Sequence, residues 1–238
     1  MLYLDIGNSN LKMKTPLLGS WTELLRVAPE DSARVVSMIN ETAGKTVWIA
    51  SVRQDVSKVI REQCPGADLR FITVSDFGKN RINYLTPDTL GVDRVLACEG
   101  ARVISGGEPV TVIDAGSACT VDIMDHDGVF HGGVIMPGLR ALESSLKVHA
   151  PELPGVERRI PDHWPGKSTT EAIQWGVTGL FVQSVRWIVE RYRDQFGDLS
   201  VWVTGGDAAN VKKYLGGAVT VHPDLVFEGM RSVAESVR

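Results

Sequence analysis

Two matching turns occur in this chain, and their repetition restricts the fold more than any other feature. The first is Asp5-Ile6-Gly7-Asn8-Ser9 and the second is Asp114-Ala115-Gly116-Ser117-Ala118. Each follows an apolar run typical of a buried strand and precedes another strand-like stretch. A carboxylate, a glycine that permits close backbone approach and a small hydroxyl residue therefore recur at corresponding places. The sequence predicts a duplicated α/β chain.

The spacing of the turns predicts two domains. The turns lie almost half the chain apart in a sequence of 238 residues, which favours two parts of similar size. Gly106-Gly107 follows a predicted helix and precedes the second apolar strand, so we place the boundary near residue 105. We expect an N-terminal domain over residues 1–105 and a C-terminal domain over residues 106–238.

Hydrophobic periodicity and turn residues predict mixed secondary structure in both domains. In the first domain we expect a loop around Pro16–Trp21, strands at 2–13, 46–51 and 69–74, and helices at 29–42, 55–63 and 92–104. In the second we expect strands at 111–113, 119–125, 129–136, 201–203 and 219–222. We expect helices at 138–147 and 169–193, a helix that opens at the Thr204–Asp207 segment and runs through 214, and a last helix that begins at 225. Asp127-Gly128 is typical of a hairpin turn.

Composition argues against several classes of protein. The net charge is −4 with interspersed signs, and basic pairs such as Arg158-Arg159 are interpreted as solvated surface, so we expect no nucleic-acid or membrane partner. No apolar run reaches the ~20 residues of a membrane span, and the chain starts directly in a strand without a signal peptide. Three scattered cysteines indicate a reducing compartment, so we expect a cytoplasmic protein.

The residues of the two turns suit a nucleotide bound with Mg²⁺. Backbone amides and small hydroxyls suit phosphate oxygens, and Asp5 and Asp114 suit a hydrated cation, because hard metals prefer oxygen ligands. The alternative for either turn alone is an ordinary Asx turn. The repetition of the whole pattern favours function, because chain reversal alone would not require it.

Two further segments have both a functional and a structural interpretation. Lys12, on the strand after the first turn, could reach a phosphate, or it could be an exposed edge-strand lysine. Thr204-Gly205-Gly206-Asp207 stands between a strand and a helix, where its glycines would let a flat group approach the helix N-terminus. A plain strand-to-helix connection explains that segment equally well.

Leu90-Gly91-Val92-Asp93-Arg94 is the segment that best suits catalysis. It lies where a glycine-bearing loop enters a helix, so Asp93 could accept the proton of an attacking hydroxyl and Arg94 could hold a carboxylate of the acceptor. The alternative is a helix-start aspartate and a surface arginine. The five histidines lack metal-ligand spacing, the Gly-x-Ser-x-Gly elbow is absent, and we assign histidine no role.

Taken together, six segments resemble the type III pantothenate kinases, whose relatives include the Bvg accessory factor proteins. The likeness covers nearly the whole chain in order, and the Gly-x-Asp-Arg and Gly-Gly-x-Ile-x-Pro-Gly segments are the most specific. The segments are Asp5 to Lys12, Gly91 to Arg94, Asp114 to Thr120, Gly132 to Gly138, Thr169 to Ile173 and Thr204 to Asp207.

The resemblance implies a duplicated actin-like, ribonuclease H-like two-domain fold of the sugar kinase and Hsp70 superfamily, assembled as a homodimer. It implies ATP-dependent phosphorylation of the primary hydroxyl of pantothenate to 4′-phosphopantothenate, the first step of coenzyme A synthesis. The cofactors it implies are Mg²⁺ with ATP and a monovalent cation, K⁺ or NH₄⁺.

The resemblance also assigns roles to individual residues. Asp93 would be the proton acceptor, Asp5 would hold Mg²⁺ through water, and Asp114 would hold the monovalent cation. Thr169 would close the pantothenate pocket across the dimer interface. The implied ATP-binding residues are Asp5, Ile6, Gly7, Asn8, Ser9, Asn10, Leu11, Lys12 and Ser117, and the implied pantothenate-binding residues are Tyr84, Gly91, Val92, Asp93, Arg94 and Thr169.

Two other functions remain as alternatives. One is a non-catalytic accessory or regulatory protein that keeps the fold and binds nucleotide, and the other is a sugar or acetate-type kinase, or a phosphatase, of the same superfamily. Asp93 beside Arg94 argues against the first, because a binding module needs no base at the acceptor position. Against the second, no sugar-kinase signature is present.

Overall fold

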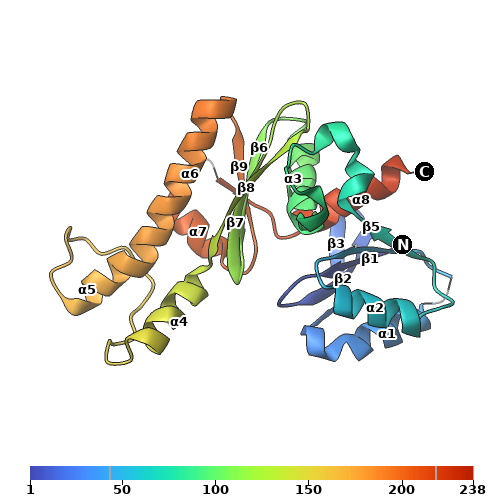
Figure 1. The fold of residues 1–238 in the computed structure, drawn as a ribbon, viewed down its shortest axis with the longest axis horizontal. Coiled ribbons are helices and arrows are strands. Elements are labelled where there is room, and N and C mark those ends of the chain that lie inside the picture. The colour runs from blue at the N-terminus through green and yellow to red at the C-terminus, as the bar shows by residue number, and fades with distance from the viewer. Residues whose placement is uncertain (43, 218, 238) are drawn as a thin grey trace. The chain divides into compact units, whose positions relative to one another are not determined.

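A computed structural model describes residues 1–42, 44–217 and 219–237, and the chain divides into two compact units (Figure 1). The first unit comprises Met1–Glu108, Met124–Gly132 and Asp224–Arg238, and the second comprises Pro109–Ile123 and Gly133–Pro223. Residues 106–108 and two later segments, Met124–Gly132 and Asp224–Arg238, therefore pack within the first unit. The predicted boundary between domains 1–105 and 106–238 remains a prediction of where the repeated halves of the sequence meet.

The strand order of the two sheets confirms the predicted duplication. The first sheet has the order β3-β2-β1-β4-β5 and the second the order β10-β9-β6-β7-β8, so β6 takes the place of β1 and β9 that of β4. The central strand of each sheet is parallel to that neighbour, β1 to β4 and β6 to β9. The strands are β1 (Leu2–Ile6), β2 (Leu11–Leu17), β3 (Ser20–Val27), β4 (Val47–Ser51), β5 (Leu69–Ile72), β6 (Val110–Ala115), β7 (Ala118–Met124), β8 (Phe130–Pro137), β9 (Ser200–Thr204) and β10 (Val219–Val221).

In the first unit, α1 (Ser32–Glu41) and α2 (Gln54–Gln63) cover one face of the sheet (Figure 1). All five residues of β1 are buried, and alternate ones point to this face because side chains alternate along a strand. The core there comprises Leu2, Leu4, Ile6, Leu11, Met13, Leu25, Val27, Val35, Val36, Ile39, Val47, Ile49, Val56, Ile60 and Cys64. This core anchors both ends of the first turn.

The other two helices of the first unit, α3 (Val92–Ile104) and α8 (Leu225–Ser236), pack together through glycines. A Cβ on Gly100 would lie 2.0 Å from the carbonyl oxygen of Leu225, and one on Gly229 would lie 2.1 Å from that of Leu96. Neither position leaves room for a side chain. This contact fixes the C-terminal helix against the helix that begins with Val92 and Asp93.

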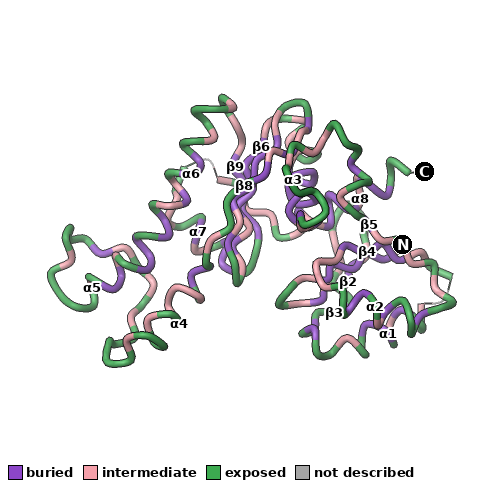
Figure 2. The backbone as a smooth tube through the Cα atoms, in the orientation of Figure 1, coloured by how far each residue is buried: buried purple, intermediate pink, exposed green. Residues whose placement is uncertain are grey.

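In the second unit, α4 (Leu139–His149), α6 (Leu180–Phe196) and α7 (Ala208–Leu215) pack on the sheet through the cluster that contains Ile113, Leu139 and Phe181. The helix predicted over 169–193 is confirmed, as α5 (Thr169–Gln174) continues into α6 through a π-helical turn at Trp175–Gly179. Figure 2 shows that the loop before α5 is largely exposed, whereas α5 itself buries Ile173 and Gln174.

The predicted loop around Pro16–Trp21 is wrong. Strand β2 continues to Leu17 and β3 begins at Ser20, with Leu18 and Gly19 forming the tight turn at φ values of 48° and 81°. Proline is tolerated in β2 because the pairing with β1 ends at Lys14, so Pro16 needs no N–H on that side. Within the described ranges, no helix combines the length and the apolar character needed to cross a membrane.

Candidate active site

The first turn projects two exposed polar residues from a buried base. The Gly7 N–H donates to the Asn10 carbonyl oxygen at 3.0 Å, and Asn8 and Ser9 between them are exposed. Ile6 and Leu11, which flank the turn, are completely buried in the core. Of the predicted phosphate-binding run, Asn8 and Ser9 are therefore presented to solvent, while Ile6 and Leu11 hold the turn in place.

Asp5 and Lys12 face each other across the first turn. They are partners in the antiparallel pairing of β1 with β2, and the Lys12 Nζ lies 3.5 Å from the Asp5 Oδ2. Because β2 lies between β1 and β3, Lys12 is not an edge-strand lysine. Burial raises the pKa of the Asp5 carboxyl, and the charge and hydrogen bond of Lys12 only partly offset this effect.

The second turn has a similar backbone and a different support. Asp114 lies near the end of β6, and the Gly116 N–H donates to the Ala118 carbonyl oxygen at 3.1 Å. Ser117 is exposed, and its carbonyl oxygen accepts from the Gly138 N–H at 3.1 Å. A Cβ on Gly138 would lie 2.1 Å from the Gly116 oxygen, so only glycine lets the start of α4 approach this turn.

The Gly-Gly segment joins the second turn at the same sheet edge. Asp114 pairs with Thr204 in the parallel ladder of β6 with β9, and the Asp207 N–H donates to the Ala115 carbonyl oxygen at 2.9 Å. Gly205 has a φ of 90°, and a Cβ there would lie 2.5 Å from the Asp114 Oδ1. The carboxyl ends of the two strands thus bring together segments that lie far apart in the sequence.

Arg158 links this edge to α4, and the sequence interpretation of Arg158-Arg159 as solvated surface is wrong for Arg158. Its Nη1 donates to the Asp207 Oδ1 at 2.9 Å, and its Nε and Nη2 donate to the two Glu143 carboxylate oxygens at 2.5 and 2.8 Å. The bonds to Glu143 raise the pKa of Arg158 despite its burial. The pair pattern gave no sign of these carboxylates, which arrive from distant segments.

Three carboxylates lie near the Cys119 thiol, and one of them, that of Asp207, is paired with Arg158. The Cys119 thiol has its pKa raised to about 12, first by burial and then by the charges of Asp114, Asp122 and Asp207. Since a carboxylate-rich, largely buried site favours a cation, the donor set suits the monovalent cation that the resemblance implies at Asp114.

The acceptor candidates lie in the first unit, at the start of α3. Gly91 caps this helix, and a Cβ there would lie 2.5 Å from the Asp93 Oδ1, so glycine is needed for the observed position of the carboxylate. The same oxygen accepts from the Arg94 N–H at 2.9 Å. Asp93 is half-buried, whereas the neighbouring Val92 is buried.

Arg94 lies beside two aromatic rings, those of Tyr84 and Phe130, whose centres are 6.3 Å apart. Its guanidinium carbon is 5.9 Å from the centre of the Tyr84 ring and 5.8 Å from that of the Phe130 ring, which favours a cation–π arrangement. A Cβ on Gly132 would lie 3.1 Å from the Tyr84 ring. The structure therefore brings Tyr84 and Arg94 together, and it adds Phe130 and Gly132, of which only Gly132 had a signal, in the glycine-rich family segment.

Thr169 belongs to the second unit, where it is the first residue of α5 and is exposed. Ser168 caps the helix, because its Oγ accepts from the Glu171 N–H at 3.2 Å. The predicted pantothenate-binding residues are thus divided, with Tyr84 and Gly91 to Arg94 in the first unit and Thr169 in the second.

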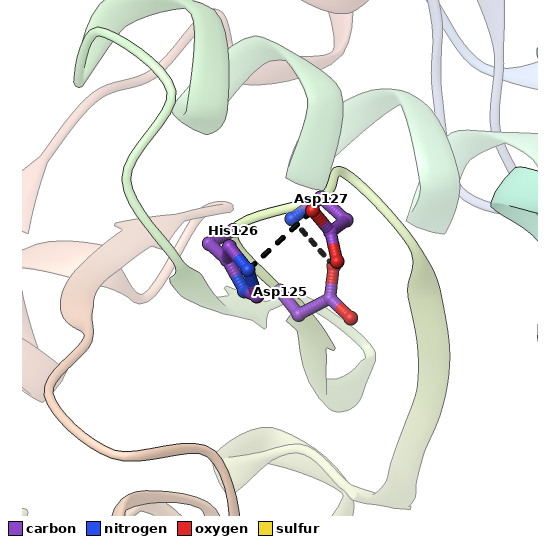
Figure 3. A group of neighbouring side chains, drawn as sticks. All are labelled: Asp125, His126 and Asp127. Carbon is purple, nitrogen blue, oxygen red and sulfur yellow. Dashed lines mark hydrogen bonds and ion pairs between the residues drawn. The ribbon is translucent and has the colours of Figure 1, made fainter.

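A cluster of metal-ligating types lies on the β7–β8 hairpin. Asp125, His126 and Asp127 bring their ligand atoms within 4.8 Å of one another, the one such group of three in the described part of the chain (Figure 3). The Asp125 Oδ1 accepts from the N–H groups of Asp127 and Val129 at 3.0 and 2.9 Å. This geometry is that of an Asx turn at the predicted hairpin, which accounts for the cluster without a metal.

Comparison with known proteins identifies the family. The family model for type III pantothenate kinases matches residues 1–191. A type III pantothenate kinase from Phocaeicola vulgatus is 30% identical over 234 residues, which cover 98% of this chain and 96% of the relative.

Solved structures resemble the chain in fold. A conserved protein from Campylobacter jejuni, named for the Baf family of transcriptional activators, has a TM-score of 0.69 at 21% identity and covers 100% of this chain and 98% of its own. A ROK hexokinase from Thermus thermophilus has a TM-score of 0.57 at 11% identity, covering 100% and 99%. The repeated sheets and these likenesses show the duplicated actin-like fold, and the chain belongs to the type III pantothenate kinase family.

Proposed function

We propose that this chain transfers the γ-phosphoryl group of ATP to the primary hydroxyl of pantothenate, giving 4′-phosphopantothenate and ADP. The observation that carries the proposal, beside family membership, is the grouping of Asp93, Arg94 and Tyr84 at the start of α3. Such a grouping supplies a proton acceptor and a cationic anchor on one helix turn.

In this mechanism the acceptor is held by Arg94 and activated by Asp93. The guanidinium, which lies beside the Tyr84 and Phe130 rings, pairs with the carboxylate of pantothenate. The Asp93 carboxylate orients the hydroxyl and accepts its proton as the oxygen attacks the γ-phosphorus. The bond from that phosphorus to the bridging oxygen breaks, and ADP leaves.

The two turns bind the nucleotide in this proposal. The exposed Asn8 and Ser9 with Lys12 contact phosphate oxygens from the first unit, and Ser117 contacts ATP from the second. Two polar turns of this kind suit a triphosphate, because amides, hydroxyls and one ammonium match its oxygens without bulky side chains.

The residues also fit the two cations. Asp5 keeps a raised pKa despite Lys12, so its carboxylate is incompletely compensated and suits Mg²⁺ through water. Asp114, in the negatively charged surroundings of Cys119, suits K⁺ or NH₄⁺. When bound with ATP, Mg²⁺ offsets the charge of the phosphates.

We further propose a cytoplasmic homodimer in which Thr169 of one copy completes the pocket of the other. Several exposed apolar side chains lie along the segment from α4 to α6, among them Trp164 at 76% exposure and Trp187 at 62%, with Val148, Leu153 and Leu180. Large exposed apolar groups favour a protein interface. The three buried cysteine thiols suit a reducing compartment.

A substrate assay tests the proposal. Purified protein with ATP, Mg²⁺ and K⁺ is offered pantothenate beside a panel of sugars, and phosphorylated products are identified by mass spectrometry. We expect 4′-phosphopantothenate alone. Turnover of a sugar without turnover of pantothenate would reject the assignment, and nucleotide binding without turnover of any acceptor would favour the accessory function.

A further inference from the structure

The hairpin of residues 124–132 builds one wall of the acceptor site. It packs within the first unit, although the chain before and after it belongs to the second. It carries Phe130 and Gly132, which contact Arg94 and Tyr84 as described above. The position of Tyr84 therefore depends on what fastens the segment Arg81–Tyr84 to this hairpin.

Backbone contacts make the first part of that attachment. The Asn83 N–H donates to the Phe130 carbonyl oxygen at 2.9 Å, and Ile82 forms an isolated parallel bridge with Phe130. The Arg81 Nε donates to the Gly128 carbonyl oxygen, also at 2.9 Å. These bonds align the segment with the hairpin but leave the Asn83 side chain, next to Tyr84, to be fixed by something else.

His131 makes that second attachment. Its Nε2 lies 2.6 Å from the Asp125 Oδ2, and its Nδ1 lies 3.0 Å from the Asn83 Nδ2. Burial raises the pKa of Asp125, but the hydrogen bonds from His131 and the Val129 N–H outweigh this and hold it below its usual value. An ionised carboxylate only accepts, so the His131 Nε2 carries the proton, and the Nδ1 accepts from the Asn83 amide.

We propose that His131 is a positioning residue of the acceptor site, which through Asn83 holds Tyr84 in place for the bound acceptor. Asp125 in turn fixes the orientation of the imidazole, as a carboxylate does in other histidine relays. The inference rests on the proposed function to the extent that pantothenate is the acceptor that meets Tyr84.

Steady-state kinetics of His131→Ala provide the test, with His126→Ala as the matched control. His126 is on the same hairpin, with its side chain 75% exposed. We expect His131→Ala to raise the KM for pantothenate about fivefold, the size of one ordinary hydrogen bond, with kcat and the KM for ATP within twofold of wild type. His126→Ala should change none of them. An equal rise in both KM values would overturn the proposal.

A second background separates positioning from general support of the fold. In Tyr84→Ala, the further change His131→Ala should leave the KM for pantothenate unaltered, because the group that it positions is gone. The same fivefold effect in that background would show that His131 does not act through Tyr84.

Amide hydrogen exchange in the substrate-free protein distinguishes this inference from the function on which it rests. We expect faster exchange at residues 81–84 in His131→Ala and unchanged exchange in His126→Ala. If wild type fails to phosphorylate pantothenate, the proposed function fails. The difference in exchange between His131→Ala and His126→Ala still tests whether His131 positions residues 81–84. Identical exchange in both variants and wild type would refute that role.

Discussion

The two turns share a backbone design and differ in charge. In the first unit, Asp5 faces Lys12 across the hairpin at 3.5 Å. In the second, Asp114 lies against the Gly205 loop, and its charge, with those of Asp122 and Asp207, adds to the effect of burial in raising the pKa of the Cys119 thiol. Duplication explains the common strand order. The residue that faces each aspartate, however, comes from a neighbouring strand in the first unit and from the loop after β9 in the second.

This difference shows how two copies of one fold unit can suit different ligands, phosphate at one turn and a cation at the other. A strand-turn-strand unit supplies amides and one carboxylate in either copy, because those groups follow from local geometry. The neighbouring strand then decides the local charge: a lysine on β2 suits phosphate, and the carboxylates near β6 and β9 suit a cation. The following experiments test this division, from the largest expected effect to the smallest.

The largest effect is expected at the acceptor site of the first unit. Asp93→Asn removes the proton acceptor while its side-chain oxygen can still accept from the Arg94 N–H. We expect kcat to fall by on the order of 10²-fold or more, the size typical of a lost general base. Circular dichroism should be unchanged. A kcat within about tenfold of wild type would remove Asp93 from the base role.

In the second unit, Gly205→Ala should disturb ATP binding, and Gly206→Ala serves as its control. Alanine at the φ of 90° strains the backbone and meets Asp114 and Ala115, whereas a Cβ on Gly206 meets nothing within 4 Å. The backbone cost is roughly 1–2 kcal/mol, which lowers Tm by about 2–8 °C. We also expect a rise of about tenfold in the KM for ATP.

The KM for pantothenate is the measurement that tests the comparison here. It should stay within twofold for Gly205→Ala, because Tyr84 and Arg94 lie in the other unit. Equal changes for the two substrates, or equal effects of the two alanine variants, would contradict the division of roles.

A smaller effect is expected from Arg158→Lys, with the adjacent Arg159→Lys as its control. Lysine cannot reproduce the fork that bonds Glu143 and Asp207 together. We expect the KM for ATP to rise about threefold to tenfold, since a charge-assisted bond is lost from a partly buried cluster. Arg159 is 51% exposed and pairs with Asp162 at 3.6 Å, so its variant should behave as wild type.

The smallest effect concerns the stability of the first turn. Because the folded state raises the pKa of Asp5 above 3.8, its contribution to stability is favourable at low pH and is lost as pH rises through the folded pKa. Asp5→Asn should therefore raise Tm at pH 7, by about 2–4 °C if 1 kcal/mol is regained. Thermal melts at several pH values measure it, and the gain should shrink below pH 3.8. A gain that does not vary with pH would argue against this cause.

Local patterns predicted much of the fold and part of the site. The repeated turns, the Asp127-Gly128 hairpin and the helix that starts at Val92 all follow from a few neighbouring residues. The loop predicted at Pro16 failed because proline usually ends a strand, and its tolerance here depends on where β1 ends. Such exceptions depend on a partner strand, which a short window of sequence does not contain.

The sequence by itself determined the duplication, the family likeness and the carboxylates suited to chemistry, because these depend on residue types at short spacing. Only the tertiary structure decided that Arg158 bridges Glu143 and Asp207, that His131 reaches Asn83, and that Gly100 and Gly229 admit a helix contact. Each of these joins segments from separate parts of the chain. Packing and hydrogen bonding select such partners by distance in space, which spacing along the sequence does not encode.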